Sequence, residues 1–182
     1  MNPLRGLARR ILEGVDVLYR RRQRLTPVGP VLYLGVVPLH EATLELANGT
    51  RLERGTPIGH LHFNNARAAA IPAANRVQNG VRFARLLRLS LAELATRARD
   101  DVALRNVPVY EGVTWFAPHG DAVGFESDPI PDGWRRRLLR AHFRLLLWAF
   151  SPTADRRAFA EVSPRRFRIS RDALIGSFSA RT

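Results

Sequence analysis

Two histidines and two asparagines lie close together in the segment 59–65, which reads Gly-His-Leu-His-Phe-Asn-Asn. The alternation of polar and apolar residues predicts a β-strand, in which period two puts His60, His62 and Asn64 on one face. The apolar side chains between them then face the core, and the polar row is able to bind a ligand. We therefore take His60, His62, Asn64 and Asn65 as candidate ligand-binding residues.

Histidine titrates near neutral pH, so His60 or His62 is also a candidate general base. The neighbouring asparagines or a carboxylate such as Glu126 would orient it, and Glu126 joins the candidate ligand-binding set for that reason. A purely structural interpretation applies to Asn65, because an asparagine after a strand often turns the chain by bonding the local backbone. The catalytic residues, if there are any, stay unassigned.

A metal site is the next alternative for this face. His60 and His62 stand two residues apart, and their imidazoles suit zinc, copper or iron. His119 with Asp121, or His40 with Glu41, would have to complete the ligand set. Nothing in the spacing requires such a site, so we expect no metal and no other cofactor.

Several reaction classes are excluded by what the chain lacks. It has no cysteine, which removes disulfides, thiolate metal sites and cysteine nucleophiles. No Gly-x-Ser-x-Gly element or phosphate-binding glycine motif is present, so the sequence carries no signature of acyl-enzyme or nucleotide-fold chemistry.

The charge of the chain predicts an anionic partner. The formal net charge is +13, and all 29 basic residues are arginine, a usage that a GC-rich genome would also produce. Nucleic acid, anionic lipid and acidic polymers all fit such a surface, but no motif for specific nucleic-acid recognition accompanies it. The candidate residues for binding an anionic surface lie on two predicted helices and are Arg20, Arg21, Arg22, Arg136, Arg140 and Arg144.

An amphipathic helix is predicted over residues 2–24 by apolar residues at three- and four-residue steps, namely Leu4, Leu7, Ile11, Val15 and Leu18. The apolar face either packs on the domain or lies on an anionic membrane with the arginines toward the phosphates. We favour packing, because Glu13 and Asp16 weaken the basic character of the helix.

The remaining pattern predicts one domain, 1–182, of the α/β (α+β) class: a mixed, largely antiparallel sheet packed against two or three long helices. Strands are predicted at 31–37, 44–46, 50–52, 58–63, 107–116, 123–126 and 166–169, with a hairpin turn at Asn48-Gly49 whose residues both take positive φ. Helices are predicted near 77–99, at 134–150 as a mostly buried helix, and from a cap at Ser170. No apolar run reaches the length of a membrane span and no signal peptide is recognisable, so we expect a cytoplasmic protein, with peripheral membrane contact as an option.

The order of these elements resembles the YkoP-like domain family. The resemblance rests on Asn48-Gly49-Thr50, the run from Gly55 to Asn65, Gly112-Val113-Thr114-Trp115 and Gly124-Phe125-Glu126. It covers residues 31–150. An N-terminal helix, 1–25, precedes this range and a C-terminal extension, 151–182, follows it. Such domains occur alone or after a polysaccharide deacetylase domain in bacteria. The resemblance implies an accessory or binding role in cell-envelope polysaccharide or glycolipid modification, with a deacetylase, a glycan or a lipid as partner.

Deacetylation itself is not expected of this chain, because it has no Thr-Phe-Asp-Asp-type metal motif. The implied connection with polysaccharide modification comes from the deacetylase domains that accompany the family, and not from a motif of this sequence. A weaker similarity is to GCN5-type acyltransferases, which share the order strand, long helix, strand and then Gly-Phe before another strand. The sequence lacks their glycine-rich pyrophosphate loop before the 77–99 helix. An acyltransferase-like enzyme, a metal-assisted enzyme and a basic nucleic-acid or anionic-surface binder therefore stand as alternatives.

Overall fold

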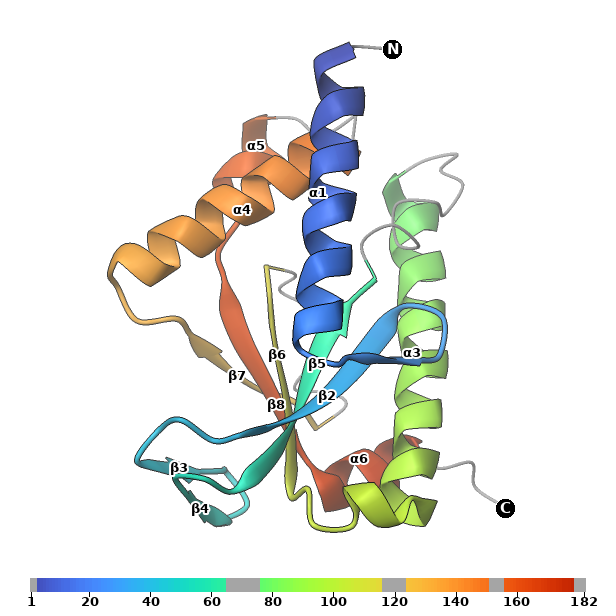
Figure 1. Ribbon diagram of the computed structural model, residues 1–182, viewed down its shortest axis with the longest axis vertical. Coiled ribbons are helices and arrows are strands. Elements are labelled where there is room, and N and C mark those ends of the chain that lie inside the picture. Colours follow the sequence, from blue (N-terminus) through green and yellow to red (C-terminus); the bar gives the residue numbers. More distant parts are fainter. Residues whose placement is uncertain (1–2, 65–75, 116–123, 151–155, 179–182) are drawn as a thin grey trace.

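A computed structural model describes residues 3–64, 76–115, 124–150 and 156–178 (Figure 1). The helices are α1 (Pro3–Arg22), α3 (Arg76–Asp100), the 3-10 turn η1 (Val102–Leu104), α4 (Trp134–Phe150), α5 (Arg156–Ala160) and α6 (Arg171–Phe178). The strands are β1 (Thr26–Val28), β2 (Leu32–Pro38), β3 (Thr43–Glu45), β4 (Arg51–Glu53), β5 (Pro57–Phe63), β6 (Val109–Thr114), β7 (Glu126–Pro129) and β8 (Arg165–Ser170). The predicted mixture of one main sheet, long helices and an N-terminal helix is confirmed.

The main sheet has six strands in the order β1-β2-β5-β6-β8-β7. Among the described strands, β5 and β6 form the one parallel pair, and every other pairing is antiparallel. Parallel neighbours need a long crossover connection, and here the crossover includes helix α3. The expectation of a mixed, largely antiparallel sheet is therefore confirmed, and strand β5 with its two histidines lies in the interior of that sheet.

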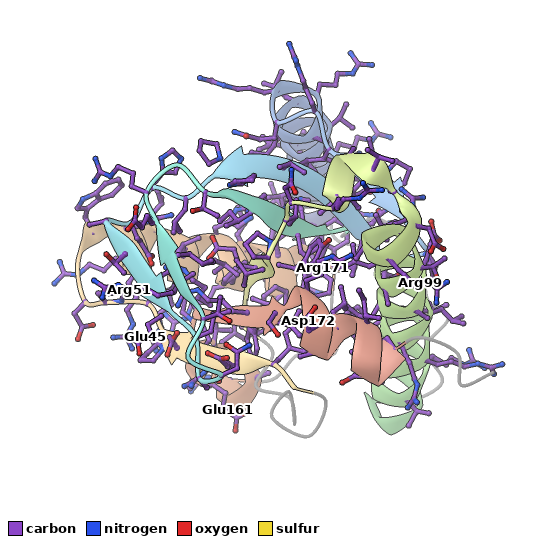
Figure 2. The ribbon with its side chains drawn as sticks, turned by 90° about the horizontal axis from the view of Figure 1, so that it is seen from below. Glu45, Arg51, Arg99, Glu161, Arg171 and Asp172 are labelled. Atoms are coloured by element: carbon purple, nitrogen blue, oxygen red, sulfur yellow. The ribbon has the colours of Figure 1, made fainter. Side chains whose placement is uncertain are left out.

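Strands β3 and β4 form a separate two-stranded sheet, in which Glu45 pairs with Arg51, as Figure 2 shows at the edge of the molecule. The hairpin was expected at Asn48-Gly49, and it is found there. Its turn differs from the expectation, because only Gly49 takes a positive φ, of 81°. The loop is closed by bonds from Gly49 N to Leu46 O at 2.8 Å and from Leu46 N to Thr50 O at 2.9 Å, so the longer loop needs just one left-handed residue.

Three local predictions are wrong at the level of detail. Residues 26–28, for which no strand was predicted, form edge strand β1, where Pro27 is tolerated because an edge residue need not donate to a neighbour. The strand predicted at 123–126 begins at Glu126 instead. Helix α4, predicted to be mostly buried, exposes Trp134 and Leu138 at 77% and 62% and buries chiefly Phe143 and Leu146.

One face of the sheet is covered by α3 and α6 and forms the main core. Period two sends Leu32, Leu61, Tyr110 and Ile169 to this face, where they pack with Leu94 of α3 and its neighbours. Arg171 joins the two helices here, since its guanidinium donates two bonds to the carbonyl oxygen of Ala98 (Figure 2). The absence of a side chain at Gly59 admits the Tyr110 ring, which lies 2.2 Å from where a Cβ would stand.

Helix α1 lies across the opposite face, beside α4 (Figure 1). The prediction that its apolar stripe packs on the domain is wrong. The side chains that turn inward are Leu12, Asp16, Tyr19 and Arg20, which contact α4 or the sheet. The predicted stripe, from Leu4 to Leu18, points outward. Hydrogen bonds to the sheet decide the orientation of α1, because the sheet offers partners to the polar side chains of the helix and not to its apolar side chains.

Candidate functional site

The sheet face under α1 and α4 is divided into three bands. At one end Val37, Ile58 and Val109 pack beneath the β3–β4 hairpin, and at the other Val113 and Trp115 pack beneath α4. Between these apolar bands lie the polar residues of β5, β6, β8 and β7. The same alternation that makes the other face a continuous core therefore brings polar side chains from four strands together here.

Two of the predicted residues hold helix α1 on the sheet. The Nε2 atom of His62 lies 2.6 Å from Oδ1 of Asp16, and Nε2 of His60 lies 3.0 Å from the hydroxyl of Tyr19. Asp16 and Tyr19 stand three residues apart on α1 and therefore share one side of that helix. Both histidines lie on the same face of the sheet, as the period-two pattern predicts, and both use Nε2 to bind α1.

Asn64 belongs to the same network through Tyr33 of β2. Its Nδ2 donates to the Tyr33 hydroxyl at 3.1 Å, and that hydroxyl also accepts from Arg20, whose guanidinium carbon lies 4.5 Å from the centre of the Tyr33 ring. Arg20 in turn forms an ion pair with Asp16 at 2.9 Å. Sequence reasoning missed Asp16, Tyr19 and Tyr33, because only the packing of α1 on the sheet brings them to the histidines.

The C-terminal end of α1 is seated by its connection to β1. A Cβ at Gly35 would stand 2.5 Å from a Leu25 methyl carbon, so glycine at this position lets the connection pass directly over β2. Arg24 takes a φ of 51°, and the amide of Leu25 bonds to the Arg20 carbonyl at 2.9 Å. An α-helix often ends in this way, with one residue in the left-handed conformation, and glycine usually occupies that position.

A row of charged side chains continues from His60 across the sheet. The pairing of strands places His60 beside Glu111, Glu111 beside Arg168 and Arg168 beside Glu126. Partners in register point to the same face, and neighbouring strands are about 4.8 Å apart, so His60 and Glu126 are about 14 Å apart in one line. We call His60, Glu111, Arg168 and Glu126 the polar row. The sequence-predicted Glu126 thus lies in line with the histidine, although it does not contact it.

Ion pairs bind the polar row to its surroundings. Arg168, whose side chain is 8% exposed, contacts Glu111 at 3.3 Å, Asp128 at 2.9 Å and Glu41 at 3.1 Å. Arg166 pairs with the same Glu41, and Glu126 accepts a bond from the amide of Ala47 in the hairpin turn at 2.9 Å. Three carboxylates therefore contact the two guanidinium groups, and a fourth, Glu126, lies in register beside Arg168.

Arg166, Arg168 and Glu111 were missed in the sequence, although a signal was there. Arg166 and Arg168 stand two residues apart on a predicted strand, which predicts a shared face, and Glu111 is a lone charge within an apolar strand. Which carboxylates meet which arginines depends on pairing between strands that are distant in sequence.

Burial changes the proton affinity of several of these groups. Burial lowers the pKa of His60, and the charge of His62 lowers it further while Glu111 opposes the shift. Burial raises the pKa of Tyr19. At neutral pH His60 is therefore neutral and Tyr19 is protonated, and the two share one hydrogen bond whose direction depends on the tautomer of the imidazole.

His142 of α4 belongs to the same electrostatic neighbourhood. Burial lowers its pKa first, the charge of His62 lowers it as well, and Asp16 raises it. The ring of His142 is half-buried and lies against Phe143 at 5.8 Å between centroids.

No group of three or more histidine or acidic side chains that would hold a metal ion occurs in the part of the chain that the structure describes. His119, Asp121 and Asn65 lie outside the described residues. Glu41, the other proposed completion, is directed to Arg166 and Arg168 instead.

The six candidate anionic-surface arginines have different surroundings. Arg20 is turned inward, and Arg136 pairs with Asp132 at the start of α4. Arg140 and Arg144 donate to the carbonyl oxygens of Ala160 and Phe159, where cations stabilise the end of α5. Arg21 and Arg22 are exposed at the end of α1.

Together these features define a mixed α+β domain whose polar sheet face carries its own N-terminal helix. The chain belongs to the YkoP family: residues 5–178 match the YkoP domain, a wider range than the expected 31–150 that takes in both α1 and α6. No curated protein and no solved structure matches it. Within the described ranges, no helix combines the length and the apolar character that crossing a membrane requires.

Proposed function

We propose that this YkoP domain is an accessory, non-covalent binding domain in the modification of cell-envelope polysaccharide or glycolipid. The polar row is the observation that supports it. Carboxylates and guanidinium groups in a line suit the many hydroxyl groups of a sugar chain, because ionised groups make stronger hydrogen bonds than neutral ones.

Two carboxylates beside the row are accessible to such a ligand. The side chains of Glu41 and Asp128 are 39% and 59% exposed, whereas Arg168 beneath them is nearly buried. In this proposal Arg168 holds the carboxylates in position and the carboxylates contact the ligand. His60, together with His62 and Asn64, closes the row at the α1 end, and Asn65 follows directly in the chain.

The proposal predicts the preferred form of the sugar. Because four carboxylates outnumber two guanidinium groups, an amine-bearing oligosaccharide should bind more tightly than its N-acetylated form. Isothermal calorimetry with N-acetylglucosamine oligomers and their deacetylated counterparts measures this. Affinity for neither oligomer, or the reverse preference, contradicts the proposal.

The double variant Glu126→Gln/Asp128→Asn keeps both side chains as hydrogen-bond acceptors but removes two charges. We expect the affinity for the deacetylated oligomer to fall about tenfold, from the loss of charge-assisted bonds. The matched control is Asp132→Asn, an exposed carboxylate beside Arg136 outside the row, which should leave the affinity unchanged. Equal losses in both variants would show a general charge effect and not a site.

An acyltransferase-like enzyme is the second candidate, favoured by one observation. Parallel strands β5 and β6 are connected through the long helix α3, and Gly124-Phe125 precedes β7, which is the order of elements in GCN5-type acyltransferases. Acetyl-coenzyme A should then raise the melting temperature, because a ligand that binds only the folded state stabilises it. An unchanged melting temperature at millimolar acetyl-coenzyme A removes this candidate.

A further inference from the structure

Helix α1 exposes a continuous line of large apolar side chains. Their exposed fractions run from 53% to 68%, and they form what we call the outer ridge: Leu4, Leu7, Ile11, Val15 and Leu18. They recur at three- and four-residue steps and therefore lie on one side of the helix, over about 21 Å of its length. Such a length of exposed apolar surface marks an interaction site in a folded domain.

The acidic residues of α1 do not share this side. Asp16 is directed to His62 and Arg20 beneath the helix, with its side chain 9% exposed. Glu13 is paired with Arg9 at 2.9 Å. The two carboxylates that argue against a membrane-binding helix in the sequence are thus turned away from the ridge or neutralised within the helix.

Arginines accompany the ridge. Arg10, Arg21 and Arg22 are exposed on α1, and Arg24 is exposed just beyond its end. A helical repeat of about 100° per residue places Arg22 in line with the ridge, next to Leu18. The outward side of α1 therefore presents apolar and cationic side chains together, in a chain whose net charge is +13.

We propose that α1 docks this domain on the surface of an anionic lipid bilayer. The outer ridge enters the boundary between headgroups and acyl chains, and Arg21 and Arg22 contact the lipid phosphates. A second copy of the chain suits the ridge less well than an anionic surface, because it carries the same net charge of +13. The inference goes beyond the proposed function, because the ridge and the polar row are different surfaces.

The attachment of α1 to the sheet makes this surface rigid. Asp16 and Tyr19 bind His62 and His60, and Arg5 and Arg9 lie over the rings of Trp148 and Phe150 on α4 at 5.5 and 5.2 Å. The helix is therefore already folded and oriented before it meets a membrane, so binding does not bear the cost of helix formation.

Co-sedimentation of the full chain with vesicles tests the inference. The wild type should bind vesicles of equal parts phosphatidylglycerol and phosphatidylcholine, and should bind pure phosphatidylcholine much more weakly. The double variant Leu7→Glu/Leu18→Glu should lose at least about tenfold in partitioning, because two apolar side chains no longer enter the lipid. Arg21→Gln/Arg22→Gln should lose about fivefold for each arginine at low salt.

Matched variants on α3 serve as controls. Leu89 is 53% exposed there, and Arg85 and Arg88 are exposed nearby, so Leu89→Glu and Arg85→Gln/Arg88→Gln repeat the chemistry on another helix. They should bind vesicles like the wild type. All variants should keep the wild-type melting temperature, and a drop for Leu7→Glu/Leu18→Glu alone would mean that the ridge packs within the protein.

Three results overturn the inference: wild-type protein that does not bind the anionic vesicles, a ridge variant that binds them undiminished, or an α3 control that loses binding equally. A fourth is a wild-type dimer in sedimentation velocity that Leu7→Glu/Leu18→Glu converts to monomer without any lipid affinity in either protein. Calorimetry with soluble oligosaccharides separates this failure from failure of the proposed function, because the oligosaccharides require the polar row and not the outer ridge of α1.

Discussion

The two faces of the main sheet differ in what holds them to their helices. On the α3 and α6 side the contacts are apolar, and Leu94, Tyr110, Ile169 and Leu174 are wholly buried. On the α1 side Asp16, Tyr19 and Arg20 reach the sheet through hydrogen bonds and ion pairs. The first kind of contact needs only apolar residues of suitable size, whereas the second needs particular partners at particular positions. Stability should therefore depend most on the first face, and pH dependence on the second.

The largest expected effect is on the apolar side. Leu94→Ala removes a wholly buried side chain from α3 and leaves a cavity against the sheet, so we expect a loss of about 3 kcal/mol in the free energy of unfolding. Urea denaturation measures it. The exposed Leu89 of the same helix provides the control, since Leu89→Ala should change the free energy by less than about 0.5 kcal/mol. Similar values for both would mean that this face is not the main core.

On the α1 side, Asp16→Ala removes the carboxylate that His62 and Arg20 share. We expect a loss of about 2 kcal/mol, because two partly buried polar groups lose their partner. Amide exchange of α1 should increase more than that of α3, since the helix loses its attachment and the core does not. Glu13→Ala, which removes only an exposed pair with Arg9, should cost under about 0.5 kcal/mol. Unchanged exchange of α1 in Asp16→Ala would contradict this description of the interface.

The polar side should also make stability depend on pH. The pKa values of His60 and His142 are lowered in the folded state, so below the ordinary histidine pKa of 6.5 the unfolded chain binds more protons. Stability from these residues is complete above that pH and is lost as the pH falls through the lowered values.

Melting temperatures between pH 8 and pH 5 measure this dependence. The variant His60→Gln keeps an acceptor for Tyr19 but cannot titrate, so its melting temperature should fall less on acidification than that of the wild type. Parallel decreases in the two proteins would assign the acid sensitivity to other groups.

The smallest effect is expected for a buried polar group on the apolar face, the hydroxyl of Tyr110. The Tyr110 hydroxyl is buried without a hydrogen-bond partner, and burial raises its pKa to about 12. Tyr110→Phe should therefore change the free energy of unfolding by no more than about 0.5 kcal/mol, or increase it, because no bond is broken. Urea denaturation again provides the measurement. A loss above 1 kcal/mol would reveal a partner for this hydroxyl.

Much of the fold was predictable because it follows from local periodicity. The period-two pattern of 58–63 correctly put His60, His62 and Asn64 on one face, and the bounds of α4 agree with the predicted helix. Periodicity also found the outer ridge of α1 as an apolar stripe. It did not reveal that the stripe faces outward, since an amphipathic pattern shows which residues share a side and not what that side contacts.

The candidate site was predictable only in part. Its histidines were found because they share a strand, and Glu126 was named without its place in the polar row. Asp16, Tyr19, Glu111 and Arg168 were missed, because each meets the histidines or Glu126 through pairing between distant segments.

The sequence by itself determined most of the strands, the long helices, the side on which each residue of a predicted strand lies and the net positive charge. These properties depend on residue type and spacing along the chain. Only the tertiary structure decided that His60 and His62 hold a helix, that Glu111 and Arg168 extend them into a charged row, and that the apolar stripe of α1 is exposed. Strand order and helix docking bring together residues far apart in the chain, and the local spacing of residues does not determine those long-range contacts.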